Sequence, residues 1–408
     1  MPGTSPQGTG LRRSLSVWQA IGLSIALMAP SMAANINPQA SAATAGRAVP
    51  LAFLIAAVGV LLVAYTFVRL CQYYHHSGSV YAFVGATLGP RAGVVAGWGL
   101  LGTYTFYAVV TSSAAGIFGT AFLNAVGGWP HPPSWAPFLL AGVALAVTLL
   151  LAIVPARRGT NVLLSVEGAT VALIGIVTVI VLVRLLSGSA PGGHHFTLSV
   201  FSVPPGTSFS PLFLAVVFGF LSFAGFEAAA TLGEEATHPT RDIPRAILGT
   251  AVFGGIYFVV VTVIYLAAFH ANAEDSFAWS GTIGTLILLV AYVLATIGCM
   301  IGVFVRRKLP VPMWQAVVPL MALVVLGYTL YRNVIPYPPS GPGRWFPVVA
   351  GGWLVLALVA VIVAPGFARR LGAALTASGG IAAPQPATTA PTELPAGDAA
   401  GDRRRPRA

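Results

Sequence analysis

Residues 213–227 read FLAVVFGFLSFAGFE, an apolar run that ends in the carboxylate of Glu227. Gly219, Gly225 and Gly233 flank this acid, and each glycine costs a helix roughly 1 kcal/mol of propensity. We therefore expect a spanning helix that opens near its middle. Opened backbone inside lipid is tolerated only where it lines a cavity or is buried in protein, and an intramembrane acid is by default functional. Both considerations predict a functional site at Glu227.

The segment that follows, 234–245, reads EEATHPTRDIPR and combines charges with helix-breaking prolines. This composition predicts that the spanning helix ends at a water interface. Four charged residues of the segment could pair as a cytoplasmic gate, or they could serve only to end the helix, since surface ion pairs are individually weak. The four candidates for the gate are Glu234, Glu235, Arg241 and Asp242.

The composition is that of a polytopic membrane protein. Of 408 residues, 56% are hydrophobic and only 8% are charged, and the mean hydropathy is +0.84, which no ordinary soluble domain of this length shows. The net charge of +11 could suggest nucleic acid, but the basic residues are scattered between apolar runs, so we assign them to orientation in the bilayer. We expect no nucleic-acid partner, no cofactor and no metal, because the pair His75 and His76 lacks further ligands and the two cysteines read as apolar fillers.

About ten apolar runs have the length that a bilayer-crossing helix needs. With the N-terminus inside, 17 of the 21 basic residues fall on the cytoplasmic side, which predicts that both termini are cytoplasmic. We expect a disordered arm over 1–14, a transmembrane domain over 15–370 and a disordered tail over 371–408. The predicted spans are 16–36, 48–69, 93–124, 136–155, 161–187, 209–232, 244–269, 279–304, 312–331 and 345–364.

The first span, 16–36, is a second candidate for a broken helix. Pro30 removes a backbone donor and clashes with the preceding turn, while Gly22, Ser24 and Ser31 can accommodate an opened backbone. The alternative is a kinked helix that serves only for packing.

Two strings resemble a known family. Residues 222–227 (SFAGFE) and 233–247 (GEEATHPTRDIPRAI) closely resemble the sixth helix and the next cytoplasmic loop of the amino acid/polyamine/organocation (APC) permeases. The resemblance implies an all-α, inverted-repeat transporter whose first and sixth helices are broken around a site at the membrane midplane. Because the run 279–304 resembles the tenth helix of the family, helices eight and nine are expected to be missing and the second repeat to be incomplete.

The resemblance also implies that a substrate contacts both broken helices, which offer free amides to a carboxylate and carbonyls to an ammonium group, and that Phe223 or a neighbouring aromatic covers it. Tyr104 and Tyr107 of the third span could line the substrate path or could only pack. Glu227 is a candidate proton carrier, with a structural acid bonded to opened backbone as the alternative. The substrate contacts expected from the broken helices are Ala26, Met28, Ala29, Pro30, Ser31, Ser222, Phe223, Ala224 and Gly225.

A second acid, Glu167, falls near the cytoplasmic end of the fifth predicted span. It follows Arg157 and Arg158 in the chain, so it is expected either to pair with one of these arginines or to face an inner vestibule, with the pairing favoured.

The expected function is secondary transport of an amino acid or a related amine across the plasma membrane, by proton symport or by exchange. The alternative is a non-transporting or defective truncated relative that acts as a scaffold or regulatory membrane protein, which an incomplete second repeat would favour. An enzyme is not expected, since no nucleophile stands with a base and an orienting residue. The expected partners are the small-molecule substrate, protons and the lipid bilayer, and an oligomer is left open.

Overall fold

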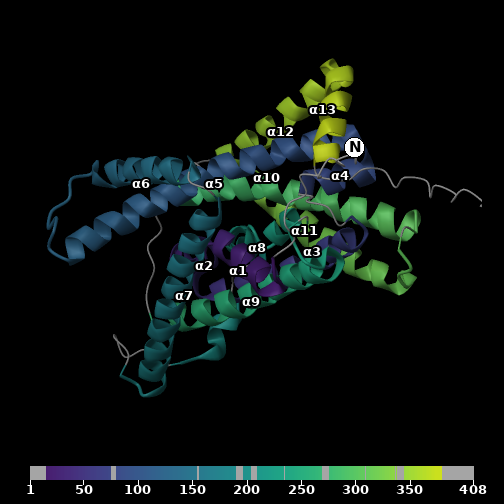
Figure 1. Ribbon diagram of the computed structural model, residues 1–408. Coiled ribbons are helices and arrows are strands. Elements are labelled where there is room, and N and C mark those ends of the chain that lie inside the picture. Colours follow the sequence, from purple (N-terminus) through teal and green to yellow (C-terminus); the bar gives the residue numbers. More distant parts are fainter. Residues whose placement is uncertain are drawn as a thin grey trace, which may run out of the picture.

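The computed structural model is predominantly helical in the part of the chain that it describes (Figure 1). That part comprises residues 15–74, 80–153, 156–189, 196–203, 209–233, 235–268, 275–307, 309–335, 337 and 344–378. Within these residues the β pairing is limited to an isolated bridge between Leu15 and Ala236. The all-α architecture that the family resemblance implies is thereby confirmed for the described residues.

Long helices account for most of the described chain. The α-helices are α1 (Val17–Leu27), α2 (Pro30–Ala45), α3 (Val49–Tyr73), α4 (Val80–Leu88), α5 (Pro90–Ala125), α6 (Ala136–Ile153), α7 (Ala156–Leu186), α8 (Phe209–Phe223), α9 (Pro239–Ala268), α10 (Asp275–Cys299), α11 (Val317–Val334), α12 (Trp345–Val363) and α13 (Pro365–Ser378). Short helical segments are η1 (Gly46–Ala48), η3 (Leu198–Phe201), η4 (Ala228–Leu232), η5 (Met300–Val305) and η6 (Met313–Ala316).

The number of membrane spans agrees with the prediction. Among the described residues, nine helical segments are long and apolar enough to cross a bilayer, and a tenth apolar stretch, Ala136–Leu150, is shorter. These segments coincide with the ten apolar runs of the sequence. The chain is thus a multi-pass membrane protein.

The first span is broken between α1 and α2. Met28 and Ala29 separate the two helices, and Ala29 adopts the left-handed conformation with φ 44°. Pro30 explains this geometry, since a proline disfavours the α conformation of the residue before it and fits the first position of a helix. A left-handed residue other than glycine costs on the order of 1–3 kcal/mol, so surrounding contacts must hold the break. The predicted broken helix is confirmed.

The sixth span is broken between α8 and η4. A turn over 224–227 separates them, and Gly225 at its centre has φ 102°, a conformation that suits glycine. Gly219, by contrast, lies inside an intact helix, where an added Cβ would lie 2.5 Å from the Cβ of Ala56. Of the glycines that flank Glu227, Gly225 opens the helix and Gly219 allows α8 to approach α3 closely.

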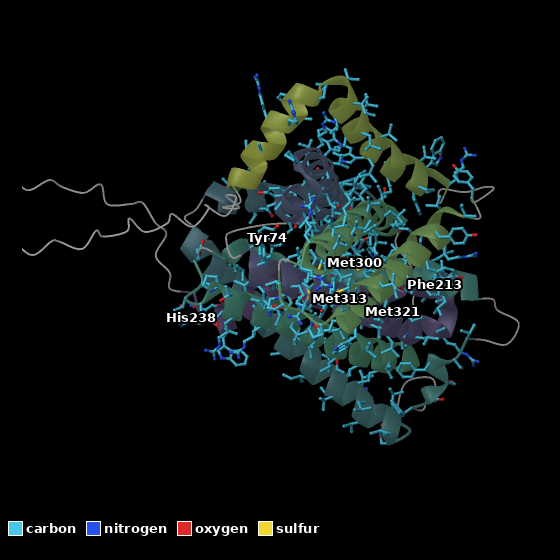
Figure 2. The ribbon with its side chains drawn as sticks, turned by 90° about the vertical axis from the view of Figure 1, so that its right-hand side faces the viewer. Tyr74, Phe213, His238, Met300, Met313 and Met321 are labelled. Carbon is cyan, nitrogen blue, oxygen red and sulfur yellow. The ribbon has the colours of Figure 1, made fainter. Side chains whose placement is uncertain are left out.

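The two broken spans pack against each other at the centre of the helical assembly. α2 lies against α8, while α1 contacts η4 and α9 (Figure 1). Figure 2 places Phe213, near the start of α8, and His238, which precedes α9, on opposite sides of the molecule. The segment that contains the second break therefore crosses the whole thickness of the protein.

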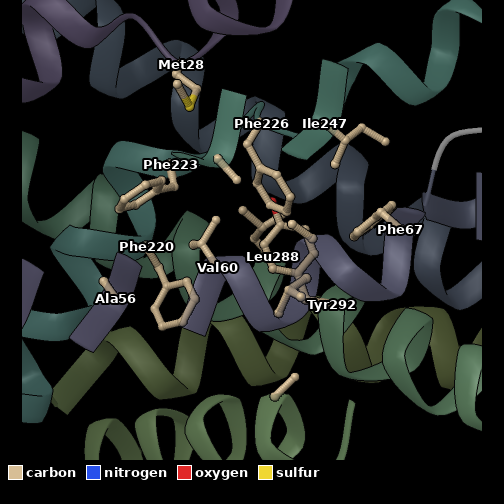
Figure 3. Close-up of a cluster of buried hydrophobic side chains, with 14 of the residues drawn as sticks. Met28, Ala56, Val60, Phe67, Phe220, Phe223, Phe226, Ile247, Leu288 and Tyr292 are labelled. Carbon is tan, nitrogen blue, oxygen red and sulfur yellow. The ribbon is translucent and has the colours of Figure 1, made fainter. Parts of the chain in front are cut away.

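Aromatic rings fill the interior beside the second break. The rings of Phe67, Phe226 and Tyr292 meet pairwise edge to face, with centroids 5.8 to 6.0 Å apart. Figure 3 shows them converging from three separate parts of the chain. Such pairs add about 0.5–1.5 kcal/mol each beyond the area they bury, so this cluster fixes the position of Tyr292.

The C-terminal boundary of ordered structure lies later than predicted. The tail was expected to begin at residue 371, but α13 continues to Ser378 and packs against α4 and α5. The arm 1–14 and residues 379–408 lie outside the described residues. The helical part of the chain therefore extends eight residues beyond the expected boundary.

Candidate functional site

A cavity of about 490 Å³ lies where the two helix breaks face each other. It is lined by both breaks and by α5, with further contributions from α6 and α10. The cavity unites seven of the predicted site residues, Met28, Ala29, Tyr104, Tyr107, Ala224, Gly225 and Glu227. Five others do not line it, and these are Ala26, Pro30, Ser31, Ser222 and Phe223.

Glu227 is held at the cavity by a tyrosine that the sequence did not indicate. Its side chain is 6% exposed, and its Oε2 accepts a 2.8 Å hydrogen bond from the hydroxyl of Tyr292. Burial of a carboxyl group is tolerable when hydrogen bonds compensate for lost water, and the Tyr292 hydroxyl supplies one. Tyr292 lies inside an apolar run, and its hydroxyl group, which needs a hydrogen-bond partner when buried, is the one feature of the sequence that could have indicated this contact.

The two breaks touch through main-chain atoms. A Cβ added at Gly225 would lie 3.1 Å from both the carbonyl carbon and the oxygen of Leu27, so this approach requires a glycine. The hydroxyl of Ser24 accepts a 2.8 Å hydrogen bond from the amide of Ala229. α1 therefore supplies the acceptor for a buried amide in the first turn of η4.

Asn37 presents a hydrogen-bond acceptor that the described protein does not use. Its Nδ2 donates to the hydroxyl of Ser222 at 2.6 Å, and that hydroxyl donates in turn to the carbonyl of Phe218 at 2.9 Å. Because the Ser222 hydroxyl donates its hydrogen to the Phe218 carbonyl, it can only accept from Asn37, so the NH₂ group of Asn37 must point toward it. The Oδ1 atom is left buried and unpartnered within the described residues, in a side chain that lines the cavity and is 1% exposed.

Glu167 has a partner that the sequence did not indicate. Its Oε1 accepts from both the amide of Ser31, at 3.1 Å, and the hydroxyl of Ser31, at 3.0 Å. The side chains of Arg157 and Arg158 are outside the described part of the structure. The expectation that Ser31 offers a free amide to substrate is therefore corrected, because Glu167 already accepts from it at the first turn of α2.

Of the three aromatic residues predicted at the site, two line the cavity and one lies in the core. Tyr107 hydrogen-bonds to Thr285 at 3.2 Å, and Tyr104, 57% exposed, stands on the same helix. Phe223 is fully buried, with its ring 5.2 Å from that of Phe258. Phe223 therefore packs in the core in this conformation, and the aromatic rings available to a ligand are those of Tyr104 and Tyr107.

The charged residues beyond η4 include a contact that the sequence did not predict. Asp242 lies beside His238, with Oδ2 3.7 Å from Nδ1, a contact that is an ion pair only when His238 is protonated. Arg241 and Glu235 are exposed, and Glu234 lies outside the described residues. An i,i+4 pair at the first turn of α9 stabilises that helix start by only a few tenths of a kcal/mol, about 0.2–0.5.

The fold and the cavity together define the class of the protein. A multi-pass helical bundle carries a chamber at two facing helix breaks, and Glu227 is the one charged side chain among the described residues that line it. Unwound backbone at membrane depth is tolerated where it lines such a cavity, and this is the architecture of secondary transporters.

Comparison with known proteins assigns the family. The model of the family described as "Amino acid permease" matches residues 16–332, and the chain belongs to this family. The low-affinity putrescine importer PlaP of Escherichia coli is 27% identical over 252 residues, which cover 62% of this chain and 53% of the importer. Human cationic amino acid transporter 4 is 27% identical over 67% of this chain and 44% of its own length, and the Escherichia coli methionine/branched-chain exporter YjeH is 28% identical over 72% and 66%. The chain spans about half the length of the first two relatives.

Proposed function

We propose that this protein is a secondary active transporter of an amino acid or a related amine, working by proton symport or by exchange across the plasma membrane. The observation that carries the proposal is the buried Glu227 in a cavity bounded by two broken helices. The relatives named as importers, exporters and transporters of putrescine, cationic amino acids, and methionine support the same class of substrate. The expected loss of family helices eight and nine stays a prediction.

The ligand's ammonium group would bind where acceptors converge. Glu227 contributes a carboxylate, and Asn37 contributes its unpartnered Oδ1. α1 ends at Leu27 and α8 ends at Phe223, and the C-terminal end of a helix carries about half a negative charge. The opened residues beside these ends, Met28 and Gly225, line the cavity.

Glu227 would couple transport to protons through charge balance. A deprotonated carboxylate in this buried position is costly unless a cation neutralises it, and a bound ammonium group does so. Substrate binding and release of the Glu227 proton therefore favour each other, and linkage requires this coupling to be reciprocal. We also propose a cytoplasmic gate at the start of α9, formed by Glu234, Glu235, Arg241 and Asp242. His238 contacts Asp242 there.

The distribution of basic residues supports an orientation of the chain in the bilayer. We place both termini in the cytoplasm, with residues 15–370 forming the transmembrane domain, because cytoplasmic segments of membrane proteins are enriched in Lys and Arg. Large apolar side chains are exposed on the outer helices, for example Phe138, Leu149 and Ile362. These side chains would face the lipid bilayer.

The test is uptake into proteoliposomes that contain the purified full chain. Radiolabelled amino acids and amines are supplied with an outward proton gradient, with an inward one and without a gradient. Because substrate binding favours release of the Glu227 proton, accumulation driven by the outward gradient, that is, exchange of protons for substrate, is the expected result. Glu227→Gln should abolish the response to the gradient, whereas Glu393→Gln, the same chemical change in the predicted tail, should not. Unchanged coupling in Glu227→Gln removes the proton role. No uptake or exchange of any tested compound leaves the alternative, a non-transporting membrane protein.

A further inference from the structure

The start of α2 is the place where a ligand carboxylate would be expected to bind. α2 begins at Pro30, directly after the cavity-lining Met28 and Ala29, and Met32 in its first turn also lines the cavity. The N-terminal end of a helix carries about half a positive charge and unsatisfied amides, which favour anions. In this protein, that position already has an anion of its own.

Glu167, carried by α7, provides that anion. It accepts the first available amide of α2, that of Ser31, at 3.1 Å, and the Ser31 hydroxyl at 3.0 Å. Pro30 has no amide to offer, and Ala29 provides no side-chain cap. The cap of α2 is therefore supplied by a carboxylate from a residue 136 positions later in the chain. A ligand carboxylate at the same end would have to approach a second negative charge.

The rest of the cavity is also arranged for positive charge. Glu227 is the one charged residue in the described lining, and the ends of α1 and α8 that border it are C-terminal ends. Asn37 adds an acceptor, Oδ1, without a partner in the described residues. Attraction for an ammonium group is thus present, while the main attraction for a carboxylate is cancelled by Glu167.

We propose that Glu167 is a specificity-determining residue that occupies the anion-binding end of α2 and thereby makes the site select organic amines without a carboxylate over zwitterionic amino acids. This inference rests on the proposed transport function. Glu167 acts through position, since it does not line the cavity itself but holds Ser31 and balances the charge of the helix end.

Matched ligand pairs that differ by the carboxylate alone test the proposal. Cadaverine is compared with lysine, and agmatine with arginine, as inhibitors of uptake and as ligands that raise the melting temperature of the purified full chain. The wild type should bind each amine about tenfold more tightly than its amino acid, the scale expected for a charge at a helix end. In Glu167→Gln, this ratio should fall toward one, mainly because the amino acids bind more tightly.

Two variants separate specificity from structural damage. Glu167→Asp retains the negative charge and should retain the preference for amines, and Glu393→Gln should leave the ratio at the wild-type value. A wild type that prefers lysine to cadaverine, or a folded Glu167→Gln with an unchanged ratio, overturns the proposal while leaving transport intact. If neither member of either pair binds or is transported, the proposed function itself fails. If Glu167→Gln does not fold, the proposal is still tested by the ratio of amine to amino acid affinity in the wild type and in Glu167→Asp.

Discussion

The hydroxyl of Ser24 in α1 accepts a 2.8 Å hydrogen bond from the backbone amide of Ala229 in η4, and both residues are fully buried. This bond joins the first broken span to the sixth across 205 positions of sequence. Breaking a helix frees amides that water cannot reach inside a membrane, so each freed amide needs an acceptor from elsewhere. One broken span therefore supplies part of what the other has lost.

Replacing Ser24 tests this dependence. Ser24→Ala leaves the Ala229 amide buried without its acceptor, and we expect a loss of about 1–3 kcal/mol in the free energy of unfolding. The measurement is the melting temperature in detergent. Thr105→Ala is the control, because the Thr105 hydroxyl is exposed and bonds only to its own helix at Leu101. Equal melting temperatures for the two variants would show that the bond between the breaks contributes nothing.

Tyr292 is expected to be needed for transport rather than for folding alone. Tyr292→Phe keeps the ring between Phe67 and Phe226 but removes the 2.8 Å hydrogen bond to Glu227. Hydrogen bonds to charged groups contribute about 1.5–3 kcal/mol, so the uptake rate at fixed pH should fall by about tenfold or more. Tyr328→Phe serves as the control, since its ring packs on Phe213 and does not line the cavity. Wild-type uptake by Tyr292→Phe would contradict a role for this contact.

A comparison of substitutions at Asn37 and at Ser222 distinguishes a role of Asn37 in ligand binding from a role in packing. Asn37→Ala removes the acceptor Oδ1 and the bond to Ser222, whereas Ser222→Ala removes that bond and the bond to the Phe218 carbonyl but leaves Oδ1 in place. If Oδ1 binds substrate, the first change should raise the half-saturating substrate concentration about tenfold, and the second should raise it much less. Concentration-dependent uptake gives both values. Equal shifts would assign Asn37 to packing alone.

The sequence predicted the helix breaks because local chemistry dictates them. Pro30 constrains the residue before it, and Gly225 permits a backbone angle that other residues rarely adopt. The position of Glu227 at the cavity followed from the cost of placing an acid inside an apolar run. These three residues carry their signals within a few positions of sequence, so no knowledge of the tertiary packing was required.

Contacts between distant segments could not be predicted in the same way. Nothing near Glu167 in the sequence points to Ser31, because their contact depends on how α7 crosses α2. Tyr292 reads as one more aromatic in an apolar run until the structure shows its hydroxyl at Glu227. The assignment of Phe223 to the core depends likewise on Phe258, a residue of another helix.

A methyl group at Gly225 is expected to damage the site more than the same change elsewhere. Gly225→Ala places a Cβ 3.1 Å from the main chain of Leu27 and forces φ 102° on a residue that avoids it. Backbone strain of this kind costs on the order of 1–3 kcal/mol, so we expect a lower melting temperature and reduced uptake. Gly175→Ala in α7 is the matched control, because an added Cβ there meets nothing within 4 Å, and alanine in such a helix should be neutral or stabilising. If Gly225→Ala and Gly175→Ala have the same melting temperature, the two breaks can move apart without loss of stability. The close approach of Gly225 to Leu27 is then not what shapes the cavity.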